Sequence, residues 1–184
     1  MSISHSGFDN NTASWHGGAP LSWIGAIYIN NCDFISNEVH HSGGTIYVMN
    51  GTINIYWSEF IHNDAGFGRA MCTFDTIVNI NQSEYIINRA CSDGGAMDIN
   101  SRSKLINDVV TLNISGSAFY NKADNGGAII ARKVTVTINN SKFIENTAGT
   151  GVLYISESNI LLSENTTIAN NIGSNITILV QQQV

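Results

Sequence analysis

Hydrophobic and polar residues alternate in short runs that recur along this chain. Five such runs, at residues 27–29, 53–55, 78–80, 112–114 and 136–138, each begin seven residues before an aromatic residue. Because alternation places the aliphatic side chains on one face and the polar one on the other, each run predicts a half-buried β-strand. Similar runs follow pairs of glycines or their remnants, at 44–48, 95–99 and 152–155. A third short strand is expected at each aromatic residue, so the pattern indicates three strands per repeat.

The aromatic residues give the length of the repeat. They are Phe8, Phe34, Phe60, Tyr85, Phe119 and Phe143, with Ile168 in the seventh place, and their successive spacings are 26, 26, 25, 34, 24 and 25. Such a short repeat cannot hold a pair of helices or a propeller blade. The chain is therefore expected to be all-β, a single domain of residues 1–184 folded as a right-handed parallel β-helix (solenoid) of about seven coils with about 25 residues each. The longest interval, from Tyr85 to Phe119, predicts a loop insertion near residues 101–109.

An asparagine follows each of these positions by two or three residues. The series is Asn11, Asn37, Asn63, Asn88, Asn121, Asn146 and Asn171. Asparagine tolerates the left-handed backbone conformation, and we expect these residues to adopt it. Since the coils stack, each side chain is also expected to bond to its equivalents above and below, as a structural asparagine ladder. The glycine pairs are expected at tight corners, where a side chain would collide or φ is positive.

Composition and charge narrow the class of partner. Hydrophobic residues make up 43% of the 184, enough for a sizeable core, whereas charged residues make up only 12%. Residues 1–68 carry five acids and no Lys or Arg, and residues 143–184 carry three acids and no base. These acidic ends argue against nucleic acid as a partner. No apolar run reaches the roughly 18 residues that membrane insertion requires, and residues 1–7 do not resemble a signal peptide, so a secreted form would be a mature or excised segment.

Two sets of short motifs resemble a known family of repeats. The tetrapeptides Gly-Gly-Thr-Ile at 43–46, Gly-Gly-Ala-Met at 94–97 and Gly-Gly-Ala-Ile at 126–129 are interleaved with Phe-x-x-Asn at 34–37, 60–63 and 143–146. This combination resembles the repeats of chlamydial-type polymorphic outer-membrane proteins. The resemblance implies a surface-exposed β-helical passenger that acts as an adhesin.

N-glycosylation sequons point to an extracellular or cell-surface location. The seven sequons begin at Asn10, Asn50, Asn81, Asn113, Asn139, Asn165 and Asn175. None of the seven ladder asparagines begins a sequon, whereas seven of the other 17 asparagines do. This division predicts buried ladder residues and N-linked glycans along the outside of the rod. The alternative is that turns rich in Asn, Ser and Thr produce sequons by composition alone.

Candidate residues for chemistry are sparse. Cys32, Cys72 and Cys91 fall at different phases of the repeat, so they should not stack, and their odd number leaves at least one unpaired within the chain. The pair His40-His41 is expected at a surface turn rather than at a metal site. Enzymes with this fold act chiefly on acidic polysaccharides and need acids gathered on one face. Asp75 and Asp98 lie at different distances from their corner glycines and should not stack, so we expect no catalysis, no cofactor and no metal.

Two classes of function then remain, a structural filament and an adhesin. The pattern continues to both ends without a polar cap, so we expect the partners to be copies of the chain or adjoining coils of a longer chain. The acidic ends weigh against bare stacking unless cations intervene. An adhesin would need an exposed aromatic patch, for which the candidates are Trp15, Trp23, Tyr56 and Trp57. We expect a rigid β-helical rod in a filament or surface coat, with an adhesin segment as the first alternative and a polysaccharide-acting enzyme as the second.

Overall fold

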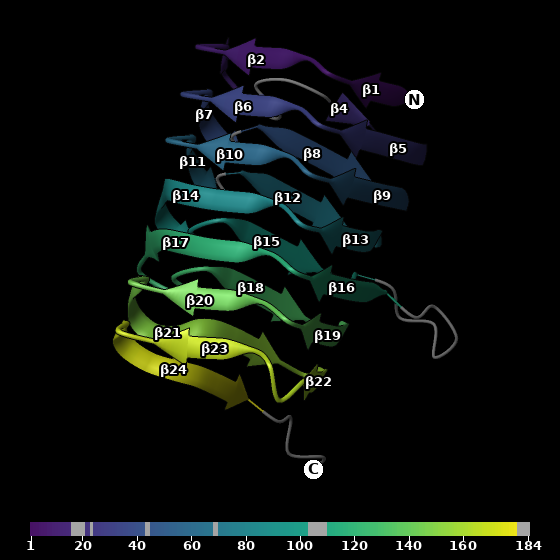
Figure 1. The fold of residues 1–184 in the computed structure, drawn as a ribbon. Coiled ribbons are helices and arrows are strands. Elements are labelled where there is room, and N and C mark those ends of the chain that lie inside the picture. Colours follow the sequence, from purple (N-terminus) through teal and green to yellow (C-terminus); the bar gives the residue numbers. More distant parts are fainter. Residues whose placement is uncertain (16–20, 23, 43–44, 68–69, 103–109, 180–184) are drawn as a thin grey trace.

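The computed structural model describes residues 1–15, 21–22, 24–42, 45–67, 70–102 and 110–179. All the regular elements within this part of the chain are β-strands, wound into a parallel solenoid with turns of about 25 residues (Figure 1). The all-β fold class predicted from the repeat is therefore confirmed. Each turn passes through three short strands, and equivalent strands stack along the length of the rod.

The alternating runs form one continuous sheet, sheet A. Its order is β1 (Ser2–Ser4), β5 (Gly25–Asn30), β9 (Gly51–Tyr56), β13 (Ile77–Asn81), β16 (Thr111–Ser115), β19 (Thr135–Asn139) and β22 (Asn159–Leu162). The strands are parallel and in register, so that Ile53 pairs with Ile27 on one side and with Val78 on the other. The structure completes about six turns rather than the predicted seven. The chain passes through sheet A seven times, and only six complete turns lie between the first pass and the last.

A second set of strands carries the aromatic residues. It consists of β2 (Gly7–Asp9), β6 (Asp33–Ile35), β10 (Glu59–Ile61), β14 (Glu84–Asp93), β17 (Ala118–Ala123), β20 (Lys142–Ile144) and β23 (Thr167–Ala169). In three turns a separate strand follows the ladder asparagine: β3 (Thr12–Ala13), β7 (Glu38–Ser42) and β11 (Asp64–Phe67). In β14 and β17 the same segment continues without a break. The aromatic side chains of this set point into the core.

The third set of strands follows the glycine corners. It consists of β4 (Leu21–Ser22), β8 (Ile46–Met49), β12 (Met71–Phe74), β15 (Met97–Asn100), β18 (Ile129–Arg132), β21 (Thr147–Ser156) and β24 (Ile172–Leu179). We call the outward side of β8, β12, β15, β18 and β21 the third face. Its residues pair in register from strand to strand, so that Cys72 faces Asp98 and Phe74 faces Asn100.

A column of aromatic rings runs through the core. The rings of Phe8, Phe34, Phe60, Tyr85, Phe119 and Phe143 stack in that order, with centroids 4.6–4.9 Å apart and planes within 8° of parallel. The aliphatic residues of sheet A and of the third set of strands fill the rest of the interior. Each of the four inner rings therefore packs between the ring before it and the ring after it, as the repeat predicts.

The corners correct one prediction. The ladder asparagines do not themselves take positive φ; in six of the seven places the preceding residue does: Asn10, Ser36, His62, Ile87, Glu145 and Asn170. The reason is geometric, because the left-handed residue turns the chain and leaves the asparagine free to point its amide along the rod. The glycine prediction is confirmed at Gly94, where φ is 63°, and at Gly95, where a Cβ would collide with the carbonyl oxygen of Gly127. The pairs 17–18, 43–44 and 68–69 lie outside the described residues.

The insertion is visible as a jump in register. Asn79 pairs with Asn54 in the turn before and with Asn113 in the turn after. The sequence numbers of the first pair differ by 25, whereas those of the second pair differ by 34. The nine additional residues enter between β15 and β16. Ser101 and Arg102 begin this interval, and the rest of the predicted loop, residues 103–109, lies outside the described part of the chain.

Candidate functional site

The asparagine ladder runs the length of the rod. The side-chain amide of Asn37 donates to Oδ1 of Asn63 at 3.0 Å, and that of Asn63 donates to Oδ1 of Asn88 at 2.9 Å. In most steps the backbone N–H bonds to the same oxygen as the amide does, whereas between Asn121 and Asn146 the backbone N–H alone makes this bond, at 2.6 Å. From Asn37 onward each amide also donates to the carbonyl oxygen of an aromatic residue one turn back, as Asn63 does to Phe34 at 3.0 Å. The five inner ladder residues are buried, and Asn11 and Asn171 are half-buried. Bonding between neighbouring ladder residues is therefore present as predicted.

A second ladder, of serines, was not predicted. It lies at the corner between sheet A and the aromatic strands and includes Ser58, Ser83, Ser117 and Ser141, all buried. Each hydroxyl donates to the carbonyl two residues earlier and accepts the N–H of its equivalent one turn back, as Ser83 does with Asn81 and Ser58. Cys32 takes the serine position in its turn and directs its thiol at the carbonyl of Asn30 at 3.3 Å. This position in the serine ladder explains why Cys32 is buried.

The sequon asparagines lie on the outside of the fold. Asn10, Asn50, Asn113, Asn165 and Asn175 are exposed, and Asn81 and Asn139 are half-buried. The residues predicted for the ladder and those predicted for glycans therefore fall into two structural classes. Whether the sequons carry sugars stays a prediction.

Three of the sequons share the outward face of sheet A. Asn81 and Asn139 both pair with Ser115, from either side, and Asn113 lies in the neighbouring row. The seven strands of this sheet contain no charged residue. A short outer row of amides crosses the face, with Asn113 donating to Asn79 and Asn79 to Asn54, both at 2.9 Å. The whole face therefore offers amides and hydroxyls but no ionic group.

The aromatic residues considered for adhesion do not form one patch. Trp15 is 69% exposed and stacks on His41, with ring centroids 5.8 Å apart. Trp57 is 57% exposed and lies 5.9 Å from the ring of Tyr56, at the corner that follows sheet A. These two tryptophans belong to different corners of the coil, and Trp23 lies outside the described residues.

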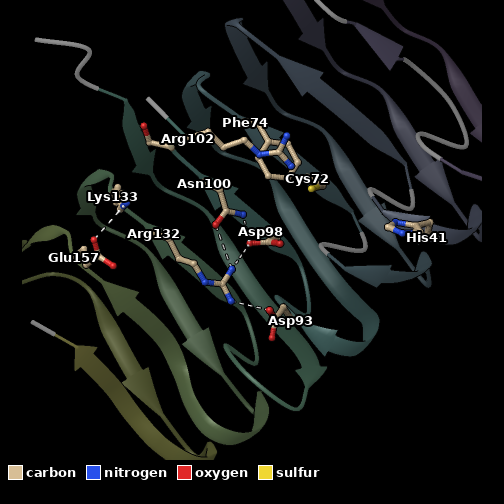
Figure 2. Close-up of a pocket in the computed structure, with 11 residues that line it drawn as sticks. His41, Cys72, Phe74, Asp93, Asp98, Asn100, Arg102, Arg132, Lys133 and Glu157 are labelled. Carbon is tan, nitrogen blue, oxygen red and sulfur yellow. Dashed lines mark hydrogen bonds and ion pairs between the residues drawn. The ribbon is translucent and has the colours of Figure 1, made fainter. Parts of the chain in front are cut away.

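A pocket of about 530 Å³ opens on the third face (Figure 2). It is lined by His41, Cys72, Phe74, Asp93, Asp98, Asn100, Ser101, Arg102, Arg132, Lys133 and Glu157. Three of the eight basic residues of the chain are therefore gathered here, together with three acids. Such a concentration stands out in a chain that is only 12% charged.

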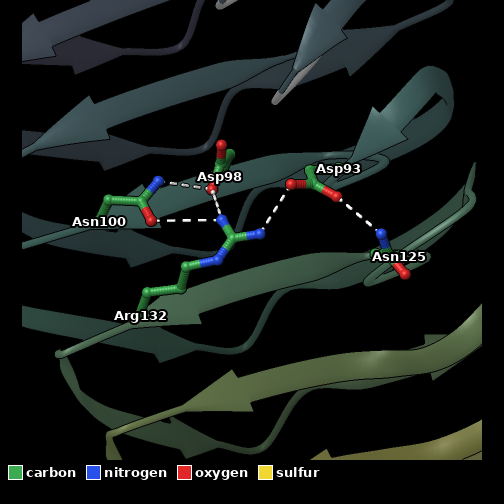
Figure 3. Close-up of polar contacts among 5 residues, drawn as sticks. All are labelled: Asp93, Asp98, Asn100, Asn125 and Arg132. Atoms are coloured by element: carbon green, nitrogen blue, oxygen red, sulfur yellow. Dashed lines mark hydrogen bonds and ion pairs between the residues drawn. The ribbon is translucent and has the colours of Figure 1, made fainter.

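Arg132 is the centre of a polar network in this pocket (Figure 3). Its guanidinium bonds to Oδ2 of Asp93 at 2.7 Å and to Oδ1 of Asp98 at 3.0 Å. It also donates to Oδ1 of Asn100 at 3.3 Å, and Asn100 in turn donates to Asp98 at 2.7 Å. Asn125 donates to the other oxygen of Asp93 at 2.9 Å. Two consecutive turns are thus joined by one guanidinium between two carboxylates.

Burial controls the electrostatics of the network. Asp98 is only 4% exposed, and this burial raises the pKa of its carboxyl to about 6, against the opposing effects of Arg132 and of the Asn100 hydrogen bond. Burial also raises the pKa of the neighbouring Cys72 thiol, and the Asp98 charge adds to the effect. The site therefore holds a carboxyl group whose pKa is raised to about 6 beside a thiol whose pKa is raised as well.

Arg102 forms the opposite wall of the pocket. Its guanidinium lies 3.7 Å from the centroid of the Phe74 ring. Its backbone N–H donates to Oδ1 of Asp75 at 2.7 Å, and the hydroxyl of Ser101 bonds to the same oxygen at 3.2 Å. Asp75 thus anchors the first residues after β15. Asp75 and Asp98 occupy different places in the coil, as predicted, because Asp98 pairs with Cys72 and Asp75 lies beyond the end of β12.

The remaining candidates are placed as follows. Cys32, Cys72 and Cys91 form no disulfide with one another, and the first two are buried. The described residues contain no group of three His, Cys, Asp or Glu side chains suited to a metal ion. No helix long and apolar enough to span a membrane occurs in the described part of the chain.

Sequence reasoning missed the Arg132 network. Asp93 lies just before a glycine corner, where a turn would account for it, and the structure gives it an ion pair with Arg132. The strand register across the insertion was not worked out from the sequence. Asn100 pairs with Arg132, although their separation in the sequence exceeds the usual repeat. Adding the inserted residues to the usual spacing would have placed Arg132 on the same face as Asp98.

Comparisons of the sequence with family models, curated proteins and solved structures found no match. The likeness to chlamydial-type repeats is therefore a resemblance of short motifs, and the parallel solenoid is what the structure itself establishes.

Proposed function

We propose that this chain is a rigid structural element of an extracellular filament or surface coat. The observation that carries the proposal is the continuity of its internal columns. The asparagine ladder connects turn to turn, and the aromatic rings from Phe8 to Phe143 stack without interruption. Because bending the rod would separate buried hydrogen-bond partners, these columns favour a stiff body.

The sequons support an outside covered by N-linked glycans. All seven asparagines are at least partly exposed, and three of them share the uncharged face of sheet A. A broad face without charge is a poor solubilising surface by itself. Glycans at Asn81, Asn113 and Asn139 would supply that hydration, and they would place the protein at the cell surface or outside the cell.

Assembly along the rod axis is the corresponding proposal for partners. Every bond between neighbouring ladder residues runs in the same direction, with the donor in one turn and the accepting Oδ1 in the following turn, so the ladder has a polarity. Copies of the chain, or adjoining coils of a longer chain, would continue the ladder only when they stack head to tail. The proposed function includes neither catalysis nor a cofactor.

An adhesin is the second candidate. It is favoured by the exposed Trp57, which packs beside Tyr56, and by the motifs that resemble chlamydial-type surface repeats. In that case the same rod would present side chains to a receptor rather than bear load within a coat.

Negative-stain electron microscopy of the native material tests the rod. The proposal predicts straight rods or fibres of uniform width. Discrete compact particles that never extend or associate would contradict it and would favour the adhesin.

A further inference from the structure

One cation of the third-face pocket has no acidic partner among the described residues. Arg132 is bound by Asp93 and Asp98, and Lys133 lies 3.6 Å from a carboxylate oxygen of Glu157. Among the described residues, by contrast, no carboxylate pairs with the guanidinium of Arg102, which rests on the Phe74 ring at 3.7 Å. Arg102 is exposed to the pocket, and stacking on the ring holds its planar fork in place. It is thus preorganised to bind an anion.

One carboxylate oxygen of the same pocket receives no hydrogen bond from the described residues. Oδ1 of Asp98 accepts from Asn100 at 2.7 Å and from Arg132 at 3.0 Å. No described residue donates to Oδ2, and Figure 3 shows this oxygen turned away from Arg132 and Asn100. Asp98 is only 4% exposed and lines the pocket. Oδ2 is not one of the fully buried, unpartnered side-chain atoms of the described residues, so the pocket reaches it, and a donor from a ligand can approach it there.

The two groups belong to the same face of the solenoid and line the same pocket. Phe74, which carries the Arg102 guanidinium, pairs with Asn100, and Asp98 lies two residues before Asn100 on the same strand. Strand spacing and strand rise place the Phe74 and Asp98 positions about 8 Å apart on the diagonal. A pyranose ring with a carboxylate substituent is of comparable length, so a ligand of this size suits a pocket with these two groups in its wall. The pocket volume of about 530 Å³ is also within the range of small-molecule sites.

We propose that the third-face pocket binds a single carboxylated sugar residue. The ligand carboxylate pairs with Arg102, and a ring hydroxyl donates to Oδ2 of Asp98. A hydroxyl suits this acceptor better than an ammonium group, because Arg132 already contacts the same carboxylate and would repel a second cation. This binding activity goes beyond the rod function, and the rod does not depend on it.

Calorimetric titration of the intact chain tests the site, with glucuronate, galacturonate, glucose and acetate as probes. At least one uronate should bind at least about tenfold more tightly than either glucose or acetate, since only the uronates carry both the charge and the hydroxyls. Arg102→Gln should weaken uronate binding about tenfold. Lys142→Gln is the matched control, because Lys142 is an exposed base on β20 in the aromatic set of strands and should leave affinity unchanged.

A second variant tests separately the contact between the ligand hydroxyl and Asp98. Asp98→Asn should reduce the affinity for the uronate to that for acetate while binding of acetate itself persists. Thermal unfolding of each variant shows whether it is folded. Absence of uronate binding, equal binding of acetate and uronate by the wild type, or an unchanged affinity in Arg102→Gln would each overturn the proposal.

Discussion

Asn63 donates both its backbone N–H and its side-chain amide to Oδ1 of Asn88 in the following turn, at 3.0 and 2.9 Å. The same residue accepts both donors of Asn37 from the turn before, at 3.1 and 3.0 Å. One buried side chain thus joins three consecutive turns. The chain repeats this arrangement along its length, so each ladder residue stabilises its neighbours as well as its own corner.

Replacing Asn63 with alanine should therefore destabilise the protein strongly. The change removes the acceptor of the Asn37 backbone N–H and of one hydrogen of the Asn37 amide, and the carbonyl oxygen of Phe34 loses its side-chain donor. We expect the free energy of unfolding to fall by about 3–5 kcal/mol, measured by chemical denaturation. Asn159→Ala, at an exposed position of β22, is the control and should change it by no more than about 0.5 kcal/mol. If Asn63→Ala lowers the free energy of unfolding by less than about 1 kcal/mol, the ladder contributes little to stability.

The single tyrosine of the ring column offers a stabilising change. Tyr85 stacks between Phe60 and Phe119, and its buried hydroxyl has no hydrogen-bond partner within the described part of the chain. Tyr85→Phe removes that unsatisfied group and should raise the free energy of unfolding by about 1 kcal/mol. Tyr28→Phe, on the exposed face of sheet A, should have almost no effect. A destabilised Tyr85→Phe protein would mean that the hydroxyl has a partner in solution.

A strained corner gives a further prediction. Ile87 has φ of 53°, whereas the equivalent places in other turns are occupied by residues such as Asn10 and Asn170. Positive φ costs a β-branched residue about 1–2 kcal/mol. Since Ile87 is 45% exposed, Ile87→Asn should lose little packing and raise the thermal midpoint. The exposed Ile77 does not take positive φ, so Ile77→Asn should give no such gain, and equal gains in both variants would exclude relief of strain.

Asp98 should make stability depend on pH in a defined direction. Its pKa in the folded protein is about 6, above the ordinary value of 3.8, so between these values the folded state binds more protons than the unfolded state. The free energy of unfolding should therefore be larger at pH 5 than at pH 7, with a contribution of up to about 1.4 kcal/mol per pH unit.

The variant Asp98→Asn isolates this contribution. It keeps the shape of the side chain but does not titrate, so the gain between pH 7 and pH 5 should shrink. Asp33→Asn, at an exposed carboxylate on β6, should keep the wild-type dependence. Identical pH profiles for Asp98→Asn and the wild type would show that Asp98 does not titrate in this range.

The repeated residues explain how much of the fold could be predicted. Phe34, Phe60 and Tyr85 recur at one spacing, so their stacking and the ladder of Asn37, Asn63 and Asn88 follow from the period. The left-handed corner was misplaced by one residue, because the residues before the ladder asparagines share no side-chain type and left no pattern. Serines are common throughout the chain, so the serine ladder did not stand out in the sequence.

The third-face pocket could not be predicted in the same way. Arg132, Asp93 and Asp98 each occur once in the pattern, and they meet only because strands β15 and β18 pair across the nine-residue insertion. The burial of Asp98 could not be predicted either, because alternation places its side chain on the outward face, whereas it is only 4% exposed. Only the structure shows that this residue faces outward from the coil and is nevertheless buried.

Intact mass of the native protein, before and after enzymatic removal of N-linked glycans, tests the proposed extracellular glycoprotein most directly. The account predicts a drop of several glycan masses, with occupied asparagines among Asn10, Asn50, Asn81, Asn113, Asn139, Asn165 and Asn175 and none in the ladder. A native mass that equals the polypeptide mass and does not change on treatment would contradict it.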